Sequence, residues 1–198
     1  MARNNRKFGR DKNEFDQQLV DIARVTRIVA GGRRFRFRAT IVMGNKKGMV
    51  GMGMGKGGDV STAIGKAVAI AKKNMIKVSI VDNTIPHEVW VKYCGAKVFL
   101  KPAKAGTGVI AGGAVRTVMD LAGIRNITAK QYGSNNTPNN AMATLIALKG
   151  LRKPEEIAEA RGKKVEDLVG KKREEKKVEV KEVKKVAEVK KPVKTVKK

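Results

Sequence analysis

The chain has 198 residues, with 44 Lys and Arg against 18 Asp and Glu, so its formal net charge is +26. A positive excess of this size indicates a polyanionic partner, and the sequence contains neither an apolar run long enough to span a bilayer nor the apolar segment of a secretory signal behind its basic start. Cys94 and His87 are the only residues of their types, which excludes an internal disulfide and a structural zinc site. We therefore expect a cytoplasmic protein with no metal, no cofactor and no membrane association.

The two ends of the chain differ in composition from its middle. Residues 1–18 are polar and basic and predict a loosely held arm. Residues 163–198 form a Lys/Glu/Val-rich tail without an aromatic or Leu cluster, which predicts a largely disordered segment. Most of the positive charge lies outside this tail, so we expect the folded part itself to be basic.

Residues 19–82 predict three antiparallel strands and a helix. "RVTRIVA" and "RRFRFRATIVM" are strand candidates joined by a two-residue turn at Gly31-Gly32. In the second strand Phe35 and Phe37 alternate with arginines, which predicts one apolar and one arginine face. The turn "GNKKG" and a short strand "MVGMGM" follow. After Asp59 or Ser61, either of which can cap a helix, apolar residues recur at helical spacing and form a face that covers the sheet.

The glycine stretch Gly53-x-Gly55-x-x-Gly58, which contains Lys56, matches the spacing of a dinucleotide-binding fingerprint. The strand before it belongs to a hairpin rather than to a parallel βαβ unit, and no ribose-binding acid follows about 20 residues later. A Walker A loop also fails, because Gly55-Lys56 is followed by Gly and Gly65-Lys66 by Ala, and neither by Ser or Thr. We interpret the stretch as a glycine-rich bend that lets the strand meet its helix. Backbone N–H groups at the helix start, together with Lys56, would hold a nucleic-acid phosphate.

Residues 83–162 predict a second small α+β unit of the order β-β-α-β-α, with helices on one face of a sheet. "HEVWVKYC" and "AKVFLKPA" form a hairpin about Gly95, and we place Trp90 and Phe99 of these strands in the core. The loop from Gly106 to Gly113 opens a helix as in small-molecule kinases, but neither a suitable magnesium carboxylate nor a proton-handling group accompanies it. No hydrolytic trio is recognisable either, so we expect no enzyme activity.

The low aromatic content, 4%, makes single-strand binding by base stacking a poor fit. Binding through arginines and shape suits structured RNA or a duplex better. Four segments in order, "VAGGRRFRFRATIVMGNKKGMVGMGMGK", "TIPHE", "KPAKAGTGVIAGGAVRTVMDLAGIRNITAKQYGSNN" and "PEEIAEARGKKVEDL", resemble the bacterial small-subunit ribosomal protein S-five family over roughly residues 15–170. Ala30 departs from the lysine often found before the glycine pair in that family, which affects one phosphate contact at the hairpin tip.

The resemblance implies a double-stranded-RNA-binding-like domain over residues 19–82 and, over residues 83–162, a domain with a left-handed βαβ unit that some kinases and a translocation factor share. It also implies that the chain binds small-subunit ribosomal RNA, touches proteins S-four and S-eight, and lines the path by which messenger RNA enters the subunit. The hairpin tip would reach an RNA helix of the subunit head, where similar proteins affect sensitivity to spectinomycin. Gly108 and Arg116 match family positions on the S-four side.

We therefore expect a non-catalytic component of the small ribosomal subunit that supports assembly and decoding accuracy. The alternative is a free-standing RNA- or DNA-binding chaperone or nucleoid protein. Charge, motif and resemblance together select the expected RNA contacts, which are Arg27, Gly31, Gly32, Arg33, Arg34, Arg36, Arg38, Lys46, Lys47, Lys56, Gly57, Lys66, Arg125, Asn135 and Asn136.

Overall fold

A computed structural model describes residues 15–163, so the predictions for the tail and for most of the arm lie outside the described residues. The chain divides into two compact units, one up to Lys153 and one from Pro154. In the described part, the second unit holds a single helix, α4 (Pro154–Arg161), with Glu155 and Glu156 in its first turn and Arg161 in its last. These charges complement the helix dipole.

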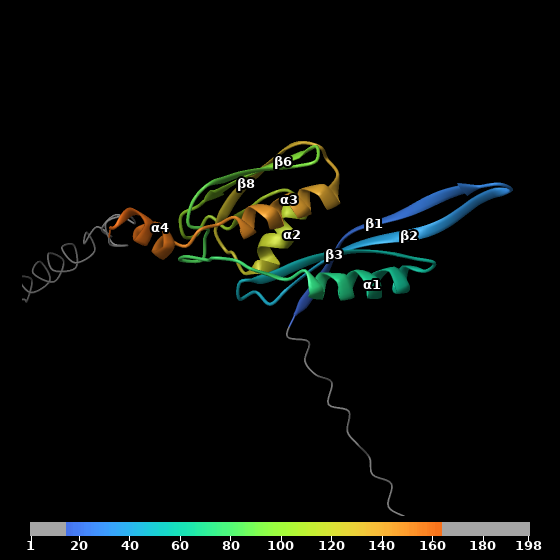
Figure 1. Ribbon diagram of the computed structural model, residues 1–198, viewed down its shortest axis with the longest axis horizontal. Helices are drawn as coiled ribbons and strands as arrows, with labels where there is room; N and C mark the ends of the chain where they lie inside the picture. The colour runs from blue at the N-terminus through green and yellow to red at the C-terminus, as the bar shows by residue number, and fades with distance from the viewer. Residues whose placement is uncertain (1–14, 164–198) are drawn as a thin grey trace, which may run out of the picture. The chain divides into compact units, whose positions relative to one another are not determined.

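The first unit contains two four-stranded sheets and three helices (Figure 1), and this α+β architecture confirms the predicted fold class. The first sheet has the order β1-β2-β3-β4 and is antiparallel throughout. Its fourth strand has only two residues, which is why no strand pattern in the sequence predicted it. The strands are β1 (Asp16–Val29), β2 (Gly32–Gly44), β3 (Met49–Gly57) and β4 (Ile76–Lys77).

The hairpin of β1 and β2 projects beyond β3 and α1 (Val60–Lys73), as Figure 1 shows. Pairing between β2 and β3 stops at Phe37 and Gly57, whereas pairing between β1 and β2 continues to Val29 and Gly32. The loop residues are Ala30 and Gly31 rather than the predicted glycine pair, and Gly31 takes a positive φ of 89° that glycine adopts without strain. The projecting hairpin is therefore a two-stranded ribbon with both faces open.

Strand β1 is longer than the predicted segment at residues 24–30, because it begins at Asp16. Its first three residues are polar, and the pattern of alternation is then interrupted by a register shift between Leu19 and Asp21. A β-bulge of this kind breaks the period-2 signal on which strand prediction depends. Residues 16–18 belong to the predicted arm and residues 19–23 precede the predicted strand, so only the pairing with β2 identifies residues 16–23 as strand.

Gly53 and Gly55 of the motif lie inside β3 together with Gly57, where they allow that strand to approach α1 closely, whereas Gly58 follows the strand. A Cβ atom added to Gly53, Gly55 or Gly57 would lie 2.0 to 2.4 Å from an atom of α1, such as the carbonyl oxygens of Ala67 and Ala63. The stretch is thus a packed strand and not a bend at the helix start, which corrects the first part of our interpretation. Helix α1 begins after Asp59, whose backbone N–H donates to the Thr62 hydroxyl at 3.3 Å.

The second sheet has the order β5-β6-β8-β7, formed by β5 (Val89–Tyr93), β6 (Ala96–Pro102), β7 (Val109–Ile110) and β8 (Ile127–Gly133). The predicted hairpin about Gly95 is present as β5 and β6. Strand β7 is parallel to β8, and α2 (Gly113–Ala122) connects them as a βαβ unit. The left hand expected for this unit remains a prediction. Helix α3 (Thr137–Lys149) contacts β5, β6 and α2.

One large core joins the two sheets of the first unit. Val42 of β2 and Met52 of β3 are buried in the same cluster as Val115 and Met119 of α2. Ile41 and Met43, on the other side of β2, pack against α1 in a smaller cluster. The side of β2 that carries arginines in the hairpin therefore becomes a core face near Val42, and the sequence did not reveal this change.

Candidate nucleic-acid interface

Five cationic side chains lie on one side of the projecting hairpin and its junction with β3. Residues directly opposite each other in an antiparallel pair share a face, and the register places Arg27 opposite Arg34 and Arg38 opposite Lys56. Arg36 lies between Arg34 and Arg38 at the strand period of two. We call this set, Arg27, Arg34, Arg36, Arg38 and Lys56, the hairpin face. It lies on the side of the sheet away from α1.

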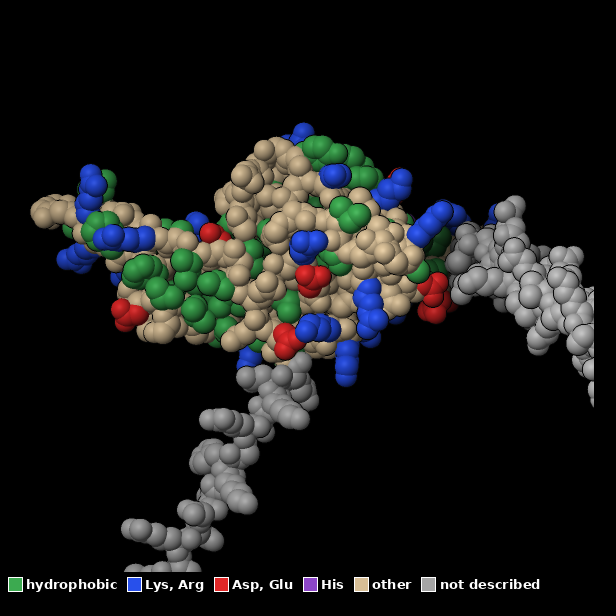
Figure 2. Space-filling view, turned by 180° about the vertical axis from the view of Figure 1, so that it is seen from behind, with side chains coloured by type: hydrophobic (Ala, Val, Ile, Leu, Met, Phe, Trp, Pro, Cys, Tyr) green, Lys and Arg blue, Asp and Glu red, His purple; other side chains and the backbone are tan. Residues whose placement is uncertain are grey.

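The hairpin face carries one carboxylate against its five cations. Asp21 accepts a hydrogen bond from Nη2 of Arg38 at 3.2 Å, and both side chains are half-buried. The other four cations are exposed, and Figure 2 shows Lys and Arg side chains on the projecting hairpin. Across residues 15–163 the structure pairs just two cations with carboxylates, Arg38 and Lys46. The remaining charge is left for an external anion or for solvent.

Arg33 faces the opposite side of the hairpin, where aromatic and aliphatic side chains surround it. The register places Arg33 opposite Ile28, and the neighbouring Phe35 lies under the guanidinium of Arg24 at 3.7 Å from the ring centroid. This contact is a cation–π interaction. The predicted RNA contacts of the hairpin are therefore distributed over both faces, with most of them on the hairpin face.

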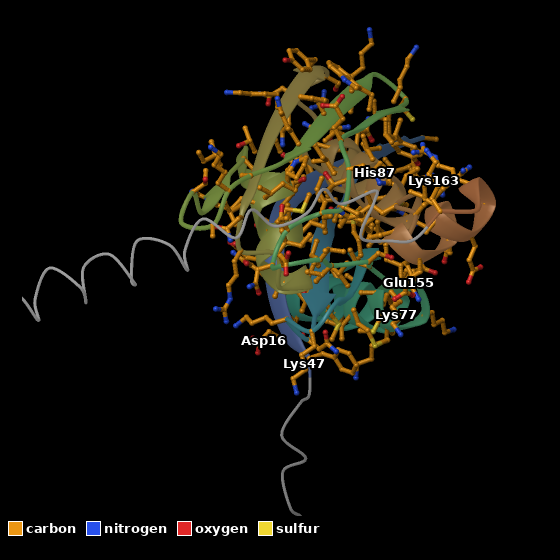
Figure 3. All side chains as sticks on the ribbon, turned by 90° about the vertical axis from the view of Figure 1, so that its left-hand side faces the viewer. Asp16, Lys47, Lys77, His87, Glu155 and Lys163 are labelled. Carbon is orange, nitrogen blue, oxygen red and sulfur yellow. The ribbon has the colours of Figure 1, made fainter. Side chains whose placement is uncertain are left out.

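The predicted contacts Lys46 and Lys47 lie at the other end of the first sheet. Eleven residues separate Arg33 from Gly44 along β2, which corresponds to roughly 36 Å of extended strand. Nζ of Lys46 pairs with Asp16 at 2.6 Å, and this hydrogen bond raises the pKa of the lysine above its ordinary value. Figure 3 shows Asp16 and Lys47 close to the same end of the sheet. The turn and the hairpin tip therefore cannot contact the same point of an RNA helix.

The other predicted RNA contacts are scattered. Lys66 is exposed on α1, and Arg125 is exposed before β8. Gly57 is buried against α1, with the Thr62 hydroxyl in the space a Cβ would need. Asn136 occupies the N-cap of α3, but its side chain makes no capping hydrogen bond.

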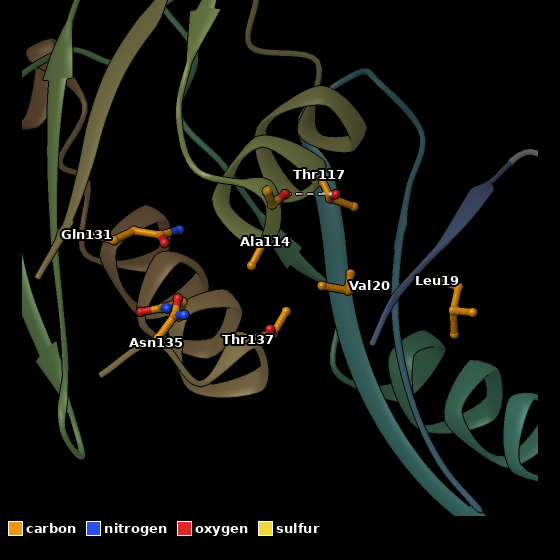
Figure 4. A pocket seen from close by; sticks show the side chains of 9 residues that line it. Leu19, Val20, Ala114, Thr117, Gln131, Asn135 and Thr137 are labelled. Atoms are coloured by element: carbon orange, nitrogen blue, oxygen red, sulfur yellow. Dashed lines mark hydrogen bonds between the residues drawn. The ribbon is translucent and has the colours of Figure 1, made fainter. Parts of the chain in front are cut away.

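Asn135 borders a cavity of about 350 Å³ near the start of α3 (Figure 4). Gln131 and Asn140 also line it, and each has a buried amide atom without a hydrogen-bond partner in the described part of the chain. Thr117, on α2, instead donates its hydroxyl to the carbonyl of Gly113 at 3.0 Å. The cavity contains none of the predicted cationic contacts.

Gly108 and Arg116, the predicted protein contacts, are brought together at the start of β7. Nη2 of Arg116 donates to the carbonyl of Val109 at 3.0 Å, one residue beyond Gly108. Gly108 has a positive φ of 74° and no neighbour within 4 Å of a Cβ position, so its backbone conformation is what requires glycine. The pair forms one corner, in which Arg116 is exposed and Gly108 is half-buried.

Asn126 holds the glycine loop in place, a role that sequence reasoning did not identify. Its buried Oδ1 accepts the backbone N–H groups of Gly106 at 3.1 Å and Gly108 at 3.3 Å. These two N–H groups are therefore already occupied and do not point toward a nucleotide phosphate. The loop differs in this respect from the phosphate-binding loops that it resembles in sequence.

Trp90 was misplaced by the sequence reading. It is 61% exposed, on the outer face of the second sheet, and it stacks on Phe99 with ring centroids 4.5 Å apart. The core side of the same strands is formed by Val98 and Leu100, which are fully buried. The strand alternation was recognised correctly, and only the choice of inner face was wrong.

No helix within residues 15–163 is long and apolar enough to cross a membrane. No group of three or more His, Cys, Asp or Glu side chains is arranged to hold a metal ion in that range.

Comparison with known proteins gives consistent matches along the chain. Residues 15–79 match the family model "Ribosomal protein S5, N-terminal domain", and residues 91–161 match "Ribosomal protein S5, C-terminal domain". The small ribosomal subunit protein uS5 of Mycoplasmopsis agalactiae is 50% identical over 170 residues, which cover 85% of this chain and 74% of that protein.

Proposed function

The chain belongs to the ribosomal protein S5 family, and from this premise we propose that its hairpin face binds a structured segment of small-subunit ribosomal RNA. Membership makes the chain a structural constituent of the small ribosomal subunit that associates with ribosomal RNA in the cytoplasm. The residues that contact ribosomal RNA, and the partner proteins that the chain meets, are part of what we propose.

The observation that carries the proposal is the alignment of five cations from three strands on one side of a projecting ribbon. Guanidinium groups bind phosphates bidentately, and duplex RNA is bound mostly through its shape, phosphates and 2′-hydroxyls across a wide minor groove. The ribbon beyond Phe37 extends for five residues of β2, or about 17 Å, which is long enough to lie along such a groove. Arg38, which is hydrogen-bonded to Asp21, lies at the end of the hairpin face where β2 pairs with β3.

Salt dependence tests this proposal. Each phosphate contact contributes about 0.7 to 0.9 to the slope of log affinity against log salt. Replacing Arg34 and Arg36 with Gln should lower that slope by about 1.5 and weaken binding to a labelled hairpin of small-subunit ribosomal RNA. The matched control replaces Lys72 and Lys73, which lie in the last turn of α1, and removes the same charge. Equal slopes for the two double variants would show that net charge, and not the hairpin face, carries binding.

We place the contact with protein S-four at the corner formed by Gly108 and Arg116. A contact that exists in just one of two subunit conformations biases their equilibrium, which would link this corner to decoding accuracy. Replacing Arg116 with Ala frees the Val109 carbonyl and removes an exposed charge. We expect altered misreading in a reporter assay at unchanged subunit abundance. The control is Arg152→Ala, at an exposed arginine outside the predicted contacts, and unchanged misreading in Arg116→Ala would refute the assignment.

The remaining parts of the proposal concern the whole chain. Residues 19–82 act as the RNA-binding domain and residues 83–162 as the domain that meets S-four and S-eight, while basic side chains also line the path of incoming messenger RNA. The chain has no catalytic role, and the occupied N–H groups of Gly106 and Gly108 support this. Absence of ATP binding at millimolar nucleotide would be consistent with it, and measurable turnover would contradict it.

A further inference from the structure

The outer face of the second sheet carries three aromatic rings and three lysines in two rows. Trp90 lies opposite Phe99, and Phe99 lies opposite Lys130. In the next row Lys92 lies opposite Lys97, and Lys97 lies opposite Tyr132. Opposed residues share a face, so these six side chains form one continuous surface, which we call the aromatic face. The helices cover the other side of the sheet, where Val98 and Leu100 are buried.

The rings of the aromatic face stack on one another and remain open to solvent. Trp90 stacks on Phe99 at 4.5 Å and on Tyr132 at 5.6 Å, with interplanar angles of 29° and 18°. Trp90 is nevertheless 61% exposed and Tyr132 48% exposed. Two large aromatic side chains left in water in a fixed stack are an unusual use of apolar surface. The arrangement fits a surface on which a planar ring of a binding partner can stack.

The charge around the rings has one sign. Strands β5, β6 and β8 contain no Asp or Glu, and Glu88 immediately precedes β5. Lys92, Lys97 and Lys130 are all exposed. A protein partner would have to bury these ammonium groups in the middle of the contact, whereas interface cores are depleted of Lys. Phosphates beside stacked bases suit the same surface without that cost.

Building on the proposed function, we propose that the aromatic face binds an unpaired stretch of small-subunit ribosomal RNA, whose bases stack on Trp90 and Tyr132 while the lysines hold the phosphates. Sheet surfaces of this composition bind single strands because unpaired bases offer free ring faces, whereas paired bases are enclosed in their own stack. Messenger RNA is the less suitable strand, because it must move with every codon and stacking on a fixed platform resists that movement. The face is distinct from the hairpin face, which is suited to duplex phosphates.

Trp90 is the only tryptophan of the chain, so its fluorescence reports directly on the proposed site. An unstructured ten-nucleotide RNA should quench the emission of the full-length chain, whereas an abasic strand of the same length and a blunt duplex should not. Trp90→Ala should weaken binding of a labelled oligonucleotide by about 5- to 150-fold, the range for loss of one stacked base, and Trp90→Phe should restore most of it. Ile70→Ala, an exposed apolar residue on α1, is the matched control.

The outcomes separate this proposal from the proposed function. Arg34→Gln with Arg36→Gln should weaken duplex binding and leave the quenching of Trp90 by the single strand unchanged. Equal binding of abasic and ordinary strands would overturn stacking and leave a merely electrostatic surface. In assembled subunits without messenger, a photo-crosslinker placed at position 90 should link to ribosomal RNA. Links to protein alone, or links that require messenger, would overturn the choice of occupant.

Discussion

Replacing Gly55 with Ala tests whether the glycines of β3 serve packing or phosphate binding. The added Cβ would lie 2.3 Å from the carbonyl oxygen of Ala63 and 2.6 Å from the backbone nitrogen of Ala67. Both atoms belong to the backbone of α1, so no side chain can rotate away. Restoring an ordinary contact near 3.4 Å requires β3 and α1 to separate by about 1 Å, which loosens the packing of Ala63, Ala67 and Ala71 against the sheet.

Overpacking of a core costs about 1 to 3 kcal/mol, and we expect Gly55→Ala to lie at the upper end because only backbone can move. For a chain of this size 3 kcal/mol corresponds to a decrease in Tm of about 6 to 12 °C. The control is Gly65→Ala in the facing helix, where a Cβ meets nothing within 4 Å. An exposed helical glycine should gain about 1 kcal/mol on conversion to Ala, so the same substitution ten residues later should raise Tm.

Thermal unfolding followed by circular dichroism measures both changes, and RNA binding at 20 °C completes the test. If the glycines of β3 serve packing, the Gly55→Ala variant should bind RNA with normal affinity at temperatures where it remains folded. A variant of normal Tm with weakened RNA binding would refute the packing account and restore the phosphate-loop interpretation.

Three further predictions follow from polar groups. Thr40 is fully buried and its hydroxyl has no partner among the described residues, so Thr40→Val should raise the free energy of unfolding by about 1 kcal/mol in urea titrations. Asn126→Ala should cost about 1 to 3 kcal/mol and accelerate hydrogen exchange at Gly106 and Gly108, whereas Asn126→Asp should keep the oxygen that accepts both hydrogen bonds. Asp16→Asn should return the pKa of Lys46, which the Asp16 hydrogen bond raises, toward 10.5 by NMR titration. A group with a raised pKa stabilises the folded state at pH values below its titration range and loses this effect above it. The wild type should therefore be more stable than this variant at neutral pH, and the difference should vanish as the pH rises through the pKa of Lys46.

The sequence predicted the elements that depend on local patterns. Strand β2 follows from the alternation of Phe and Arg, α1 and α2 follow from helical spacing beside a cap or a glycine boundary, and α3 follows from the polar cap segment before it. Strands β4 and β7, with two residues each, depend entirely on pairing partners that are distant or parallel. The core contact between Val42 and α2 could not be predicted from the sequence either, because it depends on how two elements that are distant in sequence pack together.

The glycine motif contained a signal that the spacing of a nucleotide fingerprint obscured. Gly51, Gly53, Gly55 and Gly57 recur every two residues, which is the period of one face of a strand. Ala63, Ala67 and Ala71 recur every four residues, which is one stripe of a helix. A strand face without side chains and a helix stripe of methyl groups are complementary, and together they predict close packing.

The aromatic face shows why alternation alone does not identify a binding surface. In β5 one set of alternating residues is Val89, Val91 and Tyr93, and the other is Trp90 and Lys92, so placing Trp90 in the core overlooked the lysine beside it. The lysines resolve the choice, because Lys92 has the same parity as Trp90, and Lys97 has the same parity as Phe99 in β6. An ammonium group cannot be buried unpaired at low cost, so the face that contains these lysines must be the outer one. Tyr132 shares the parity of Lys130 in β8, and all three rings therefore belong on the outer face, which we propose binds RNA.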